Sequence, residues 1–196
     1  EHARRAGRVT AARKVRERLR PAELLRVGQI DVRVIERQPE FARVDLRPGC
    51  SPVEDQGQVG SCTANAIVGA TEYRRRKRGD QEDLSRLFVY YNARRMSGAE
   101  NEDCGSRIAH GMAAILAHGA PPERAWPYDP ARVNVKPDEK AYVAAAANTE
   151  VEYARLDGVE HIKGALAREQ PVIFSISLPT RCYDEAASSG VMPVPG

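Results

Sequence analysis

The chain has 196 residues, of which 42% are hydrophobic and 29% charged, and this composition is typical of one globular domain, or of one domain with an arm. No stretch approaches the run of about 18 apolar residues that a membrane-spanning helix needs, and collagen, coiled coil and low-complexity polymer are excluded as well. The net charge of +3 is unevenly distributed: residues 1–26 carry nine basic and three acidic residues, and the remainder carries 21 and 24. The mildly acidic remainder gives no indication of a nucleic-acid surface.

The first part of the chain is predicted to be a basic N-terminal arm over residues 1–40, followed by a domain over residues 41–196. The arm has helix-forming composition over residues 11–20, and residues 30–35 alternate between apolar and charged, which predicts an edge strand. No apolar segment of the signal-peptide kind is visible at the start, so a cytoplasmic and a secreted location both stay open.

The strongest helical pattern begins at Ser61 or Cys62. It ends in the basic run 74–78, followed by Gly79, and cations before such a glycine are a helix stop signal. We therefore interpret the basic run as a complement to the helix dipole on a solvated face, in preference to a nucleic-acid patch.

Four further helices and two strands are predicted along the rest of the chain. The helices are expected over residues 84–96 with Ser85 as N-cap, 108–118 with Gly119 as the stop, 141–147, and from Asp157, which forms a capping box with Glu160, to about Arg168. Strands are expected over residues 149–156 and, as a buried strand, 172–178. Helices thus precede strands, which indicates an α+β protein with a helical half and a β half.

The segment over residues 51–66, SPVEDQGQVGSCTANA, carries the candidate chemistry. Cys62 stands at a helix start, where unpaired N–H groups and the positive end of the dipole stabilise a thiolate. Gly57 and Gly60 let the backbone pass close to a substrate. Gln56 lies six residues before Cys62, so its side-chain amide and the Cys62 backbone N–H would form an oxyanion hole. A buried structural cysteine is the commoner reading of an isolated thiol, but these features together favour a nucleophile.

The motif Gln56-Gly57-Gln58-Val59-Gly60-Ser61-Cys62 resembles the active-site segment of papain-like cysteine peptidases, and its six-residue spacing is the family's. A bacterial branch of the family is more similar, over residues 41 to 196. The other matching segments are Asp45-Leu46-Arg47, Ser85-Arg86-Leu87-Phe88, Tyr90-Tyr91-Asn92, Asn101-Glu102-Asp103, Trp126-Pro127-Tyr128-Asp129 and Gly190-Val191-Met192-Pro193.

This resemblance implies a two-lobe fold with the nucleophile on a helix of one lobe and the base on an antiparallel β lobe. Cys62 would attack a peptide carbonyl as half of a thiolate–imidazolium pair and form an acyl-enzyme that water hydrolyses. A peptide or protein substrate is implied, and no cofactor. The residues expected to bind the substrate backbone are Gly60, Ser61, Gly105 and Ser106.

The catalytic histidine of the family follows the Gly-Val-Met-Pro turn, and an asparagine comes later still, so both are expected beyond Gly196. The histidines within the chain are poor candidates for the base because of their positions: His2 lies in the arm, His110 and His118 on one predicted helix, and His161 inside another.

The remaining cysteines are Cys50, Cys104 and Cys182, among which at most one disulfide can form. Cys104 lies beside the expected substrate loop. It is interpreted as a small buried residue in preference to a second thiol near the cleft. No His and Cys pairing has zinc-ligand spacing, so no metal is expected.

Two questions stay open at this level. The arm is a propeptide-like segment that inhibits the enzyme, a basic targeting arm, or a disordered overhang; the first is favoured because papain-like enzymes are commonly made as zymogens. The domain itself is a cysteine peptidase, an inactive papain-fold binding module, or a peptide ligase or acyl transferase that uses the same thiol.

Overall fold

The structure is a computed structural model, and it describes residues 43–149, 151–177 and 180–189. Within these ranges the chain forms helices, with an antiparallel bridge between Leu84 and Pro122 and a further bridge residue at Tyr153. The α-helices are α3 (Cys62–Arg76), α4 (Arg86–Arg95), α5 (Ile108–His118), α6 (Glu139–Ala145), α7 (Val159–Ala167) and α8 (Thr180–Ser189). Short 3-10 turns are η2 (Arg47–Gly49), η3 (Glu123–Ala125) and η4 (Pro130–Arg132).

The predicted arm over residues 1–40, its edge strand and the Gly-Val-Met-Pro turn lie outside the described residues, so these stay predictions. No described helix combines the length and the apolar character needed to cross a membrane.

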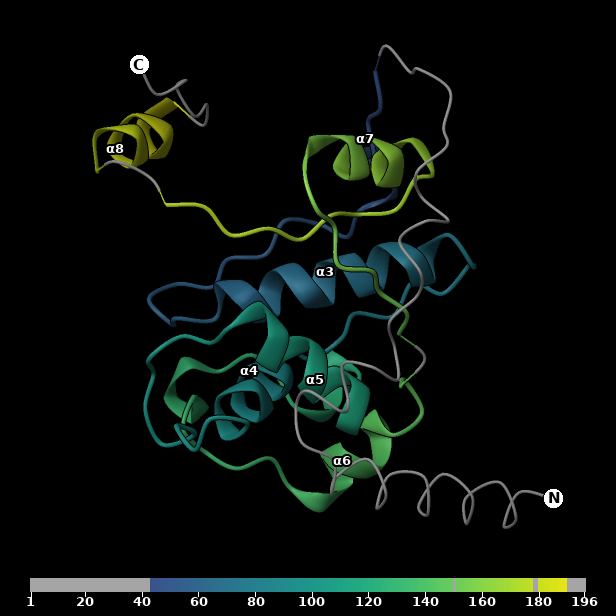
Figure 1. The fold of residues 1–196 in the computed structure, drawn as a ribbon. Helices are drawn as coiled ribbons and strands as arrows, with labels where there is room; N and C mark the ends of the chain where they lie inside the picture. Colours follow the sequence, from purple (N-terminus) through teal and green to yellow (C-terminus); the bar gives the residue numbers. More distant parts are fainter. Residues whose placement is uncertain (1–42, 150, 178–179, 190–196) are drawn as a thin grey trace, which may run out of the picture.

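The core lies where α3, α4 and α5 pack against one another (Figure 1). The middle helix of the three, α4, is buried over Arg86 to Arg94, so water reaches little of its surface. The largest buried apolar side chains are Ile67, Leu84, Leu87, Phe88, Tyr90, Ile115 and Trp126. Burial of this apolar surface is the main stabilising contribution to the helical half.

Local signals place the helices of this half. Ser85 caps α4, because its hydroxyl oxygen accepts a hydrogen bond from the Phe88 N–H at 3.2 Å, as the sequence predicts. The same hydroxyl donates to the carbonyl oxygen of Trp126 at 2.5 Å, which fixes the chain before η4 to the start of α4. α5 has the predicted bounds, and Gly119 ends it at φ +78°, where a Cβ atom would lie 2.0 Å from the Ala145 carbonyl oxygen.

The basic end of α3 is a network of ion pairs more than a solvated face. Arg75 donates to Asp80 at 2.5 Å and to Asn148 at 2.6 Å, and its side chain is mostly covered. The other pairs are Arg76 with Asp83, Lys77 with Glu169 and Arg74 with Glu152. These cations therefore fasten α3 to later segments as well as complementing its dipole.

Two predicted helices differ in how they begin. α6 starts at Glu139 because Asp138 accepts a hydrogen bond from the Ala141 N–H at 2.8 Å, a cap that the alanine pattern did not reveal. α7 exists, but the capping box between Asp157 and Glu160 was wrong. Gly158 occupies the N-cap position without a side-chain bond, and the Asp157 N–H donates to His161 Nδ1 at 3.1 Å.

The helical half is confirmed, whereas the β half is not. The described residues form no strand over 151–156 or 172–177. The prediction of a buried strand was wrong for the latter segment, where Phe174 is 67% and Ile176 53% exposed. A strand needs a neighbour to accept its backbone hydrogen bonds, and within the described residues no such pairing is recorded for 172–177. The chain continues into α8, which was not predicted and which stands apart from the helical core (Figure 1).

Replacing Ser85 by Ala should lower the free energy of unfolding by about 2 kcal/mol, because the change removes the cap of α4 and leaves the buried Trp126 carbonyl without this donor. Urea unfolding measures it. Ser97→Ala is the matched control, since this exposed hydroxyl donates to the Arg94 carbonyl at the other end of α4 and should contribute within about 0.5 kcal/mol. Equal stability of the two variants would contradict the assignment.

Candidate active site

The site is built around the first residue of α3. Cys62 is exposed and its thiol is not in a disulfide. The preceding N-cap residue, Ser61, makes no side-chain bond to the helix end, because its buried hydroxyl is used elsewhere. The thiol therefore stands at a helix N-terminus that no Ser61 cap covers, where backbone N–H groups point toward an approaching ligand.

The turn before Cys62 is tightly folded. The Gly57 N–H donates to Asp55 Oδ1 at 2.8 Å with φ +56° at the glycine, and the Ser61 N–H donates to the Val59 carbonyl at 2.7 Å. The Gln56 side chain returns toward the helix start, because its Nε2 donates to the Val59 carbonyl at 2.8 Å. An amide nitrogen carries two hydrogens, so this bond does not exhaust its capacity to donate.

A network of hydrogen bonds through two hydroxyl groups holds this turn in place. Tyr128 Oη donates to the carbonyl oxygen of Gln56 at 3.0 Å, and Ser61 Oγ lies 2.7 Å from the same phenol oxygen. Since the phenol proton is committed to the carbonyl, the Ser61 hydroxyl is the donor to Tyr128. Asn65 Nδ2 completes the network by donating to the Ser61 carbonyl at 3.0 Å and to Ser61 Oγ at 2.9 Å. Both ends of the turn are thereby fixed.

Arg86 at the start of α4 holds this network in place. Its guanidinium donates to Asn65 Oδ1 at 2.9 Å, lies 4.2 Å from the centre of the Tyr128 ring, and pairs with Glu54 at 2.5 Å. Burial raises the pKa of Glu54 above its usual value, although the charge of Arg86 opposes the rise. Because the Arg86 side chain is buried, this pair loses part of its hydration, so we assign it a role in positioning the turn more than in stabilising the fold.

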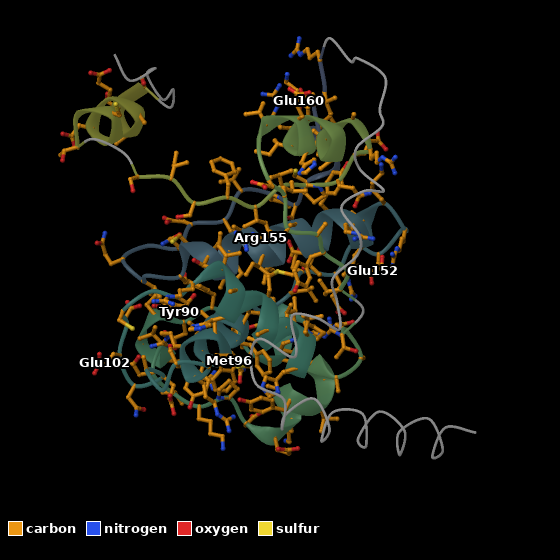
Figure 2. All side chains as sticks on the ribbon, viewed as in Figure 1. Tyr90, Met96, Glu102, Glu152, Arg155 and Glu160 are labelled. Atoms are coloured by element: carbon orange, nitrogen blue, oxygen red, sulfur yellow. The ribbon has the colours of Figure 1, made fainter. Side chains whose placement is uncertain are left out.

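A second loop reaches the same place. The Gly60 N–H donates to the Asp103 carboxylate, at 3.0 Å to Oδ1 and 3.2 Å to Oδ2. Thr63 Oγ1 donates to the Ser106 carbonyl at 2.9 Å. The loop therefore runs alongside the Cys62 turn, and Tyr90 and Glu102 mark this end of the helical half in Figure 2.

The fold thus brings the predicted site residues Gln56, Gly60, Ser61, Gly105 and Ser106 into one hydrogen-bonded assembly next to Cys62, at the N-terminal end of α3. The sequence did not identify the side chains that hold them, namely Asn65, Arg86, Tyr90, Asp103 and Tyr128. Arg86, Tyr90, Asp103 and Tyr128 stood in segments matched to the family, but no spacing along the chain indicated their contacts.

The other thiols and the imidazoles were only partly predicted. Cys104 is exposed, so the interpretation of it as a buried residue was wrong. The side chain of His118 is buried edge-on against the Tyr142 ring, with 5.4 Å between the ring centres. His161 lies on α7 and accepts the bond from Asp157. Among the described residues, no three His, Cys, Asp or Glu side chains gather in a way that would hold a metal ion.

A cavity of about 890 Å³ lies farther along α3, between Ile67 and Met112 on one side and Val172 and Phe174 on the other. Its lining includes neither Cys62 nor Gln56. The cavity is therefore adjacent to the site described above and separate from it.

Comparison with known proteins gives matches over most of the chain. The family model described as papain family cysteine protease matches residues 41–192. An uncharacterised peptidase C1-like protein of Acanthamoeba polyphaga mimivirus is 35% identical over 180 residues, which cover 86% of this chain and 58% of that protein. The crystal structure of xylellain, a cysteine protease from Xylella fastidiosa, superposes with a TM-score of 0.58 at 33% identity and covers 71% of this chain and 60% of that one. The chain thus spans less than two thirds of the length of either relative.

Replacing Tyr128 by Phe should lower the free energy of unfolding by about 1–2 kcal/mol, because the Gln56 carbonyl and the Ser61 hydroxyl each lose a partner while the ring under Arg86 stays. Tyr128→Leu also removes the ring and should lower the free energy of unfolding further. Urea unfolding of both variants measures the difference. Unchanged stability of Tyr128→Phe would show that the phenol does not hold the turn.

Proposed function

The chain belongs to the papain family of cysteine proteases, and we propose that the protein hydrolyses peptide bonds through the Cys62 thiolate. The observation that supports this most is the place of the thiol: it is free, exposed and first in a helix whose N-terminus Ser61 does not cap. Such a position favours an anionic sulfur and leaves room for a carbonyl group beside it.

In the proposed reaction the Cys62 sulfur attacks the scissile carbonyl carbon, and the carbonyl oxygen becomes an oxyanion. The C–N bond then breaks, the amine leaves with a proton, and water releases the acid from the acyl-enzyme. The base that exchanges these protons is expected at the family's position after the Gly-Val-Met-Pro turn. The same acyl-enzyme passed to an amine would give ligation, so product analysis distinguishes the two outcomes.

Gln56 and the Cys62 N–H are the proposed donors to the oxyanion. The supporting geometry is the fold of the turn, which brings the Gln56 amide back to Val59, three residues before the nucleophile. The network from Arg86 to Tyr128 holds the Gln56 backbone in advance of substrate binding. Donors fixed beforehand stabilise a developing charge more strongly than donors that must reorient.

Gly60, Ser61, Gly105 and Ser106 are the proposed contacts for the substrate backbone. Their two segments run side by side, joined through Asp103 and Thr63, and Gly105 adopts φ +78°. An extended peptide bound along these segments would lie beside Cys62, which is the alignment that the reaction requires.

Iodoacetamide near neutral pH should label Cys62 ahead of Cys50 and Cys104, although all three thiols are exposed. Peptide mapping by mass spectrometry measures the order. Cys62→Ser should reduce peptide hydrolysis about a thousandfold or more, with Cys50→Ser as the control that leaves it unchanged. Equal labelling of the three thiols would count against a nucleophile and favour an inactive binding module.

Replacing Gln56 by Ala should lower kcat about 100- to 1000-fold, because one oxyanion donor is lost. Alkylation of Cys62 by iodoacetamide should keep its rate, since that displacement forms no oxyanion. Gln58→Ala is the matched control, an exposed amide in the same turn. A variant at Gln56 with unchanged kcat would remove this residue from the oxyanion hole.

A further inference from the structure

Tyr90 and Asp103 tie the two segments of the proposed active site together. Tyr90 Oη donates to Asp103 Oδ1 at 2.5 Å, and the same carboxylate accepts the Gly60 N–H. The Gly105 N–H donates to Tyr90 Oη at 2.9 Å. One phenol and one carboxylate therefore bind the peptide groups of both glycines, one in the turn before Cys62 and one in the facing loop.

The fit around Gly60 is tight. A Cβ atom on this residue would lie 3.1 Å from Asp103 Oδ1, 3.1 Å from Tyr90 Oη and 3.2 Å from the Gly105 nitrogen. These three atoms take part in the hydrogen bonds of Tyr90 and Asp103 to the two glycines, which we call the Tyr90–Asp103 tie. A side chain at this position would press on these atoms, so the glycine lets the two segments approach closely.

The tie rests on the buried part of α4. The Tyr90 ring is fully buried, and the Arg94 guanidinium lies 4.2 Å from its centre. Arg94, buried as well, donates to the carbonyl oxygen of Glu102, next to Asp103. Burial, with a contribution from the bond to Asp103, raises the pKa of the Tyr90 phenol well above its usual value. The phenol therefore keeps the proton that it donates.

We propose that Tyr90 and Asp103 are positioning residues that set the separation and orientation of the Gly60 and Gly105 peptide groups next to Cys62. This inference rests on the proposed function, because the two segments are taken to hold the substrate backbone. Neither side chain is assigned to the reacting atoms: both act through the glycines that they bind. Loss of the tie should weaken peptide binding and leave the thiol itself as reactive as before.

The test compares two reagents on the full-length natural protein. Tyr90→Phe keeps the ring but frees the Gly105 N–H, and Asp103→Ala frees the Gly60 N–H. Each should slow inactivation by an epoxysuccinyl-leucyl amide, which needs the peptide-binding segments, about tenfold. Each should leave alkylation by iodoacetamide unchanged. Asp103→Asn keeps an acceptor oxygen and should restore most of the rate.

Tyr142→Phe is the matched control, because its buried phenol donates to Asn92 on α4 at 2.8 Å without touching either segment. This variant should leave the rates of reaction with both reagents unchanged. If Tyr90→Phe slowed the reactions of Cys62 with both reagents equally, the positioning role would be overturned and only a structural role would be left. The same conclusion would follow if Tyr142→Phe slowed the epoxide reaction as much as Tyr90→Phe does.

Amide hydrogen exchange separates this inference from the proposed function. Tyr90→Phe and Asp103→Ala should speed exchange in peptides that cover residues 57–62 and 103–107, and Tyr142→Phe should not. If Cys62 of the unaltered protein reacts with neither reagent, the proposed function fails, and faster exchange confined to these segments still supports the tie. Unchanged exchange in both segments would overturn it.

Discussion

The turn that leads into Cys62 depends on side chains from other parts of the chain to bind its peptide groups. A helix N-terminus leaves backbone donors unpaired, and the preceding turn cannot satisfy them by itself. Asp103 accepts the Gly60 N–H from one side, and Tyr128 donates to the Gln56 carbonyl from the other. These two bonds fix the direction in which the chain enters α3, and therefore the place of the thiol.

Most of the side chains that hold the site in place come from one helix, α4. Arg86, Tyr90 and Arg94 recur every four residues along α4, so they share one face. Arg86 reaches the network under Gln56, and Tyr90 and Arg94 reach the loop that carries Asp103. Each arginine also lies over a tyrosine ring, which combines charge with apolar contact. A helix that forms the centre of the core thereby also positions both segments of the candidate site.

The candidate site lies within the part of the chain that matches the papain family. The family match covers residues 41–192, and the assembly around Cys62 lies inside it. One matched relative is viral and the other bacterial, so the bacterial origin that the resemblance implied stays a prediction. The helical half of the expected two-lobe arrangement is present, whereas the described residues form no β lobe.

The sequence by itself determined most of the helices, although not α8, and the place of the Cys62 thiol at the start of α3. Caps and stop signals such as Ser85 and Gly119 act within one helical turn, so they can be recognised locally, as can the spacing from Gln56 to Cys62. Only the tertiary structure decided which side chains hold the turn, because Gly60 and Asp103 are 43 residues apart and Gln56 and Tyr128 are 72 apart. It also decided the exposure of Cys104 and the pairing of the basic end of α3. Such contacts depend on how distant segments pack, which no local pattern records.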